Sequence, residues 1–227
     1  MIITANGVRL FFEKQGQGRP VILLHGNSEN HGIFRRLARE LADDYTVYAL
    51  DTRGHGKSQR VKELHYADMA ADVAAFIHAL RLEDEKSLLY GFSDGGIVGL
   101  LVAGAWPGLL GGLAVSGASL NPQSTTDGML RLMRWTYRLT RSAKFKLMLE
   151  EPDITAADLA KITVPTLVLA GQNDMIKEEH TRRIAAGIAG SKLQILPGES
   201  HTSYVINSPK LAPLLRPFFA ELPYKAD

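Results

Sequence analysis

The stretch L-L-Y-G-F-S-D-G-G-I-V, residues 88–98, is the most informative part of the sequence, because it sets a serine between a strand pattern and a helix pattern. The run from Leu88 to Tyr90 is typical of the end of a buried strand, and the apolar residues from Ile97 onward are typical of a helix. A strand that enters a helix through glycines can hold a phosphate, or it can project a side chain into solvent. The rest of the sequence has to distinguish the two.

The bulk composition indicates one ordinary globular domain, residues 1–227. Hydrophobic residues make up 45% of the chain and charged residues 22%. The 26 basic and 24 acidic residues give a net charge of +2, so no global field points to nucleic acid. The chain has no cysteine, which excludes disulfides, thiolate metal sites and a cysteine nucleophile. It shows no secretory signal and no apolar run of the roughly 18 residues that span a membrane. We therefore expect a cytoplasmic protein without stable membrane insertion.

Short apolar runs alternate with helical patterns along most of the chain. An N-terminal β-hairpin is expected around Asn6-Gly7, since Asn-Gly suits a tight turn. Strands that are apolar on every residue need cover on both faces. The pattern predicts an α/β fold, a mostly parallel eight-stranded sheet with helices on both faces. The further strands are expected at 21–24, 45–50, 87–90, 113–115, 166–170 and 192–196, and the helices at 33–41, 67–80, 95–106, 178–189 and 209–221.

The segment between Gly117 and Val164 interrupts the alternation, because it contains no strand pattern. It predicts a small helical cap, residues 118–160, inserted after the sixth strand. Four arginines within it recur at helical spacing and share one face. That face suits plain solvation, or contact with an anionic substrate, partner or membrane surface. The four are Arg131, Arg134, Arg138 and Arg141, and the opposite face carries Met129, Leu132, Met133, Thr136 and Leu139.

The glycine turn admits two chemical interpretations. For dinucleotide binding, Gly91 and Gly96 would be the outer glycines, but Ser93 stands where a glycine must let the pyrophosphate approach, and no acidic residue follows at the required distance. For a nucleophile turn, Gly91, Ser93 and Gly95 match G-x-S-x-G, whose glycines let a strained serine project its hydroxyl. A serine that merely caps the helix would explain the same residue. The nucleophile interpretation therefore needs a base and an acid in matching places.

A serine hydroxyl needs an imidazole to remove its proton. Among the seven histidines, His201 comes just after the last expected strand, at the sheet edge where Ser93 would also emerge. His180 is a competitor, and the others suit structural or surface positions.

The acid that orients the imidazole is expected at the same edge. Asp174 follows a buried strand by a few residues. Asp51 also follows a strand, and Glu199 lies only two residues from His201, so both remain rivals. The favoured order is Ser93, Asp174, His201.

With these residues in place, the sequence resembles the α/β-hydrolase family over essentially its whole length. The resemblance implies an oxyanion hole made by the backbone N–H groups of Asn27 and Asp94, and a structural loop around His55. The chain is short for the family, so its cap is expected to be small. The motifs that carry the resemblance are H-G-N at 25–27, D-T-R-G-H-G-K-S at 51–58, G-F-S-D-G-G at 91–96, V-P-T-L-V-L-A-G-Q-N-D at 164–174 and G-E-S-H at 198–201.

The sequence says less about substrate recognition than about the catalytic residues. Trp135 and Met175 are candidate substrate-binding residues, with Met129, Met133 and Tyr137 as further cap candidates, and ordinary packing explains each equally well. Asp94 in S-D-G-G is similar to hydrolases that accept amino-acid esters, where the aspartate pairs with an ammonium group. A helix N-terminus favours the same carboxylate.

The expected activity is hydrolysis of a small carboxylic ester or related acyl compound through an acyl-enzyme, with no metal or organic cofactor. Amide, lactone, thioester and C–C bonds are alternatives, because a fold does not fix the bond that is cleaved. A ligand-binding protein without turnover is an alternative of another class. The expected partner is a small acyl molecule and not a nucleic acid, and no sequence feature supports a homodimer.

Overall fold

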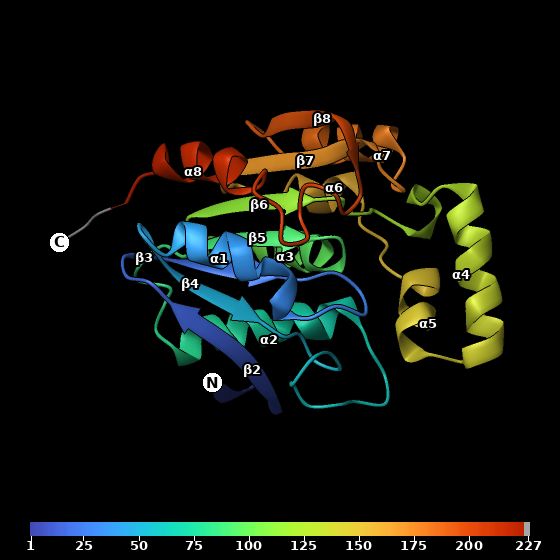
Figure 1. Cartoon of the computed structure of the whole chain (residues 1–227), viewed down its shortest axis with the longest axis horizontal. Helices are drawn as coiled ribbons and strands as arrows, with labels where there is room; N and C mark the ends of the chain where they lie inside the picture. The colour runs from blue at the N-terminus through green and yellow to red at the C-terminus, as the bar shows by residue number, and fades with distance from the viewer. Residues whose placement is uncertain (225–227) are drawn as a thin grey trace.

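The computed structural model describes residues 1–224 and contains one eight-stranded sheet with the order β1-β2-β4-β3-β5-β6-β7-β8 (Figure 1). The first two strands form the N-terminal hairpin and run antiparallel, and all pairings from β4 to β8 are parallel. The strands are β1 (Ile2–Ala5), β2 (Val8–Gln15), β3 (Arg19–Leu24), β4 (Tyr45–Leu50), β5 (Leu88–Phe92), β6 (Gly112–Ser116), β7 (Thr166–Asn173) and β8 (Lys192–Ser200).

Helices cover both faces of this sheet, because its central strands send apolar side chains to each side in turn. Val21 and Leu23 enter one core cluster, with α1 and α8, while Ile22 and Leu24 enter the other, with α2, α3, α6 and α7. The predicted fold class is confirmed. The helices are α1 (Arg35–Leu41), α2 (Tyr66–Ala79), α3 (Asp94–Ala105), α4 (Asp127–Thr140), α5 (Ala143–Glu150), α6 (Ala156–Leu159), α7 (Glu178–Gly187) and α8 (Ala212–Ala220), with short 3₁₀ helices η1 (His31–Phe34) and η2 (Pro122–Ser124).

The last strand is longer than the sequence pattern predicts. β8 continues through Pro197 and Gly198 to Ser200, which pairs with Asn173 of β7 beyond an irregularity in register. Proline and glycine ordinarily end a strand pattern, but Gly198 adopts a positive φ of 72° here and the pairing resumes after it. His201 therefore follows the end of β8 directly.

The chain between β6 and β7 contains η2, α4, α5 and α6. Helices α4 and α5 pack against each other and extend beyond the carboxyl ends of the strands, at the right of Figure 1. The short α6 instead packs on α3 and α7, beside the sheet. No helix within residues 1–224 is both long and apolar enough to cross a bilayer.

Candidate active site

Ser93 occupies a strained turn between β5 and α3. Its backbone has φ 53° and ψ −116°, a region that residues other than glycine rarely adopt. A Cβ atom on Gly91 would collide with the carbonyl oxygen of Gly95, and one on Gly95 would collide with that of Leu24, so both positions require glycine. The side chain of Ser93 makes no capping hydrogen bond to α3. Helix capping therefore does not account for this serine.

The structure brings Ser93, His201 and Asp174 into one hydrogen-bonded line. His201 Nε2 lies 3.1 Å from Ser93 Oγ, and His201 Nδ1 lies 2.6 Å from Asp174 Oδ1. With the proton on Nδ1, the imidazole donates to Asp174 and accepts from the serine hydroxyl. The side chains of His201 and Asp174 are 9% and 2% exposed, and the backbone N–H of Ile176 donates to the same Asp174 oxygen. Burial and this second donor hold the acid in one orientation.

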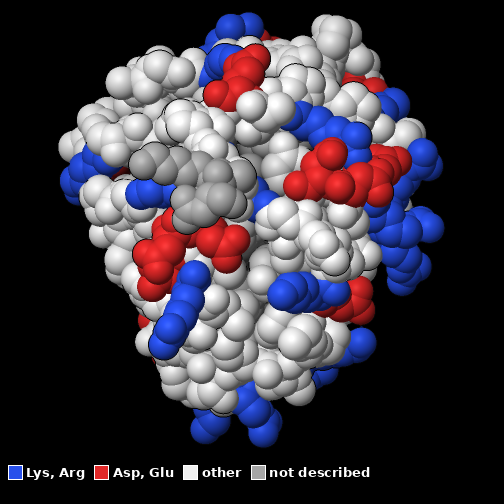
Figure 2. All heavy atoms as spheres, turned by 90° about the vertical axis from the view of Figure 1, so that its left-hand side faces the viewer, with Lys and Arg blue, Asp and Glu red and all other residues white. Residues whose placement is uncertain are grey.

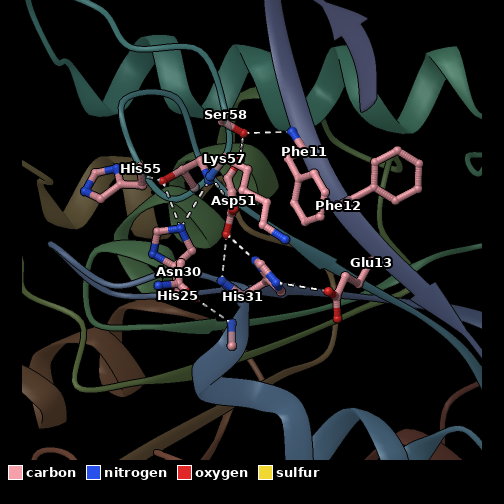
Figure 3. Close-up of polar contacts among 12 residues, drawn as sticks. Phe11, Phe12, Glu13, His25, Asn30, His31, Asp51, His55, Lys57 and Ser58 are labelled. Carbon is pink, nitrogen blue, oxygen red and sulfur yellow. Dashed lines mark hydrogen bonds and ion pairs between the residues drawn. The ribbon is translucent and has the colours of Figure 1, made fainter. Parts of the chain in front are cut away.

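The rival residues are engaged elsewhere. Asp51 accepts hydrogen bonds from the backbone N–H and the ring of His31 and from the backbone N–H of Lys57, as Figure 3 shows. Glu199 accepts from Ser203 and from Lys210. His180 is hydrogen-bonded to Ser124, 2.8 Å away. Within residues 1–224, none of these three side chains forms a hydrogen bond or an ion pair with Ser93 or His201.

Asn27 and Asp94, whose backbone N–H groups the resemblance assigns to an oxyanion hole, lie beside Ser93. Asn27 Nδ2 donates to Asp94 Oδ2 at 2.9 Å and to the carbonyl of Lys144 at 3.3 Å, so one amide links the loop after β3, the start of α3, and α5. Burial raises the pKa of Asp94 to about 6, against the opposing effect of hydrogen bonds from Asn27 and Tyr66. The N–H of Asp94 is among the first of α3, which have no acceptor within the helix.

A cavity of about 380 Å³ opens above Ser93, between the sheet and the cap. This volume lies within the range of small-molecule sites. Its charged lining residues are Glu29, Asp94 and Glu151, with no lysine or arginine among the described residues that line it. Burial also raises the pKa of Glu29, whose Oε2 accepts from the N–H of Gly26. Most of the other lining is apolar, including Phe92, Ile97, Met129, Met133, Phe145, Met148, Met175 and Ile176.

The two candidate substrate-binding residues have different positions. Met175 lines the cavity, but Trp135 does not, and its side chain is 60% exposed. The reason is helical geometry: Trp135 is two residues beyond Met133, which faces the cavity, and two residues turn an α-helix by more than half a revolution. Of the further cap candidates, Met129 and Met133 line the cavity and Tyr137 does not.

Glu29 and Tyr66 also line the cavity, although neither is a candidate on the sequence alone. Glu29 stands two residues after Asn27 in the same loop, so its proximity to the proposed oxyanion hole was a usable signal. Tyr66 opens α2 and reaches Asp94 through tertiary packing alone. No local sequence pattern predicts that Tyr66 lies at the site.

This sheet order, with a strained serine after β5 and a histidine after β8, defines the α/β-hydrolase class. The chain belongs to the alpha/beta hydrolase family, whose pattern matches residues 21–212. It is 28% identical to the AB hydrolase superfamily protein YisY of Bacillus subtilis, over 96% of this chain and 97% of that one. It is 24% identical to the serine hydrolase BPHL of Homo sapiens, over 89% and 80% of the two chains.

Solved structures show the same fold. A meta-cleavage product hydrolase from Pseudomonas fluorescens superimposes with a TM-score of 0.81 at 20% identity, covering 97% of each chain. An esterase from Thermogutta terrifontis gives a TM-score of 0.78 at 23% identity, covering 97% of this chain and 98% of that one. With its family and these relatives, the chain is an enzyme of the α/β-hydrolase type.

Proposed function

We propose that the protein is a serine hydrolase that cleaves a small carboxylic ester or a related acyl compound through an acyl-enzyme. The observation that carries the proposal is the line from Ser93 Oγ through the His201 ring to Asp174, with distances of 3.1 Å and 2.6 Å, at the floor of the apolar cavity. A nucleophile held by a base that is itself oriented by a buried acid is the arrangement that acyl transfer requires.

In the proposed mechanism His201 Nε2 takes the proton of Ser93 as Oγ attacks the carbonyl carbon of the substrate. The carbonyl oxygen becomes negative and accepts hydrogen bonds from the backbone N–H groups of Asn27 and Asp94. His201 then gives its proton to the leaving alkoxide, and the acyl group stays on Ser93. Water repeats the two proton transfers on the acyl-enzyme and releases the carboxylic acid. Asp174 keeps the Nδ1 proton in place and offsets the charge of the imidazolium.

The cavity supports a substrate without negative charge. Its lining includes three carboxyl groups and no cation, so an anionic ligand would be repelled. All three carboxyls already have partners: Glu29 accepts from the N–H of Gly26, Asp94 accepts from Asn27, and Glu151 accepts from His65 and from the N–H of Tyr66. Met129 and Met133 face the cavity from α4 and provide apolar contact for an acyl or alcohol chain. An uncharged, moderately apolar ester is the substrate class proposed.

The test is a panel of p-nitrophenyl esters that vary in acyl length, with a hemisuccinate as the anionic member. Wild type should turn over repeatedly on the neutral esters and poorly on the hemisuccinate, and Ser93→Ala should lose activity by at least about 10³-fold. Mass spectrometry after an organophosphate probe should place the adduct on Ser93. Full activity in Ser93→Ala would refute the nucleophile assignment.

The same panel addresses the alternatives. A single equivalent of product without further turnover would indicate a ligand-binding protein instead of an enzyme. The matched structures include an enol-lactonase from Burkholderia xenovorans as well as the meta-cleavage product hydrolase. A lactone and a compound cleaved at a C–C bond therefore belong in the panel, and a kcat/KM above that of every ester would replace the ester assignment.

A further inference from the structure

Helix α4 presents an apolar strip to solvent. Leu132, Trp135 and Leu139 are 52%, 60% and 64% exposed, and their spacing of three and four residues places them on one side of the helix. Among the described residues, five large hydrophobic side chains are more than half exposed, and three of them lie on this one helix. We call these three residues the α4 strip.

A row of arginines runs along the edge of the α4 strip. Arg131, Arg134 and Arg138 are exposed and form no ion pair with any carboxylate of residues 1–224. Asp127, the one acid of α4, is held by Lys177 at 3.0 Å. The guanidinium of Arg141, just past the helix, lies over the ring of Tyr137. The edge is thus cationic from Arg131 to Arg141, and the one acid beside it is Asp127 in the first turn of the helix.

The opposite end of the molecule does not separate basic from acidic side chains in this way. Figure 2 shows that end, far from the cap, with lysines and arginines interspersed among aspartates and glutamates. The net charge of the chain is only +2, so an unpaired run of like charges on α4 is a local feature. Such a run attracts an anionic surface most strongly at low salt.

The strip is continuous with the cavity above Ser93. Leu132 belongs to the strip and also lines the cavity, next to Met129, Met133 and Thr136 of the same helix. Going around α4, the arginines come first, then the strip, then the residues that face the cavity. A hydrophobic molecule lying against the strip would therefore already be at the entrance.

We propose that α4 docks on an anionic lipid surface, with Trp135 and Leu139 at the boundary between headgroups and acyl chains and the arginines against the lipid phosphates. A helix with Trp and Leu on one face and basic residues beside them is the pattern of interfacial binding. Docking in this orientation would let a lipophilic acyl compound enter the cavity directly from the bilayer. The entry step depends on the hydrolase activity proposed above, whereas docking itself does not.

The first test is sedimentation of the protein with vesicles of phosphatidylcholine, with and without 30% phosphatidylglycerol. Wild type should bind only the anionic vesicles, and binding should weaken as salt rises from 50 to 500 mM. Arg134→Glu with Arg138→Glu should reduce bound protein at least about tenfold. The matched control is Arg182→Glu with Arg183→Glu on α7, which makes the same charge change at exposed arginines and should bind as wild type. Equal loss in both pairs would overturn the role of α4.

The second test uses fluorescence, since the chain has only two tryptophans, Trp106 and Trp135. In a Trp106→Phe background, emission should shift to shorter wavelength on adding anionic vesicles and not on adding poly-glutamate. No shift with vesicles, or a response to poly-glutamate alone, would overturn the proposal and indicate an acidic protein partner.

Two variants separate this proposal from the proposed function. Ser93→Ala should still bind vesicles, and Arg134→Glu with Arg138→Glu should still hydrolyse a water-soluble short ester at the wild-type rate. Vesicle binding by a wild type that hydrolyses no ester would support docking and refute the proposed ester hydrolysis.

Discussion

At the scale of single residues, the selection of the acid shows how tertiary structure resolves a sequence ambiguity. Asp174 and Asp51 each follow a strand of the parallel sheet, and both were candidates for the partner of His201. Asp174 follows β7, beside β8, which delivers His201. Asp51 follows β4, on the far side of β3, where His31 meets it, with Glu13 at the other ring nitrogen (Figure 3). Strand order alone separates them.

The choice of Asp174 makes a quantitative prediction. Asp174→Asn leaves the size of the side chain unchanged but no longer stabilises the imidazolium or the correct tautomer, so kcat should fall by about 10⁴. Glu199→Gln is the control, since Glu199 lies two residues before His201 in the sequence but pairs with Ser203 and Lys210. Its kcat should stay within about twofold of wild type. Steady-state kinetics on one neutral ester decide, and a comparable loss in Glu199→Gln would contradict the assignment.

At the scale of elements, the turn from β5 into α3 depends on two glycines that lie very close to other backbone segments. Gly91 and Gly95 allow the chain to fold so tightly that Ser93 projects from the sheet edge, with its N–H donating to the carbonyl of Ser116 on β6 at 2.8 Å. The pattern G-x-S-x-G predicted this turn because only glycine fits at its ends. The pattern could not show that the Cβ of residue 95 would collide with the neighbouring strand β3.

Replacing that glycine should therefore be costly. Gly95→Ala should lower the free energy of unfolding by about 2 kcal/mol or more, since its Cβ would strike the Leu24 carbonyl, and should lower kcat as Ser93 is displaced. Gly128→Ala is the matched control, because a Cβ there meets nothing within 4 Å and Gly128 lies in helix α4. This control should be neutral or more stable by up to about 1 kcal/mol. Urea unfolding measures both, and equal effects would refute the argument.

At the scale of the whole molecule, two buried histidines support the loops that hold the site. His25 Nδ1 bonds to the Gly26 carbonyl at 2.7 Å, and its Nε2 accepts from the N–H of Thr52. His55 packs on His25, with ring centroids 5.2 Å apart. Burial lowers the pKa of each imidazole to about 4. Both rings are therefore neutral in the folded protein at neutral pH.

These pKa values predict a stability that declines in acid. Unfolding returns each histidine to a pKa near 6.5. Between pH 6.5 and pH 4 the unfolded chain therefore binds more protons than the folded chain, and the free energy of unfolding falls as the pH is lowered. Each histidine accounts for up to about 3 kcal/mol across that window. Asp94 acts in the opposite sense, since its raised pKa of about 6 makes the folded state the better proton binder below that pH.

The contribution of His55 can be isolated. Denaturant unfolding at a series of pH values from 7.5 to 4.5 should show a steep loss of stability in wild type and a shallower one in His55→Gln. His78→Gln is the control, because His78 lies at an exposed position at the end of α2 and should keep the wild-type slope. Parallel pH profiles for wild type and His55→Gln would contradict the buried neutral state of His55.

Local patterns in the sequence were enough to predict the alternation of strands and helices, the strained serine turn and the placement of His201 and Asp174 at strand ends. These follow from local periodicity and from glycines that no other residue can replace. Three features depend instead on how the elements pack: Trp135 faces solvent, Glu29 and Tyr66 line the cavity, and Asp51 is hydrogen-bonded to His31. Periodicity shows which residues share a face of an element, but the residues that cover that face come from distant parts of the chain, so no local pattern identifies them.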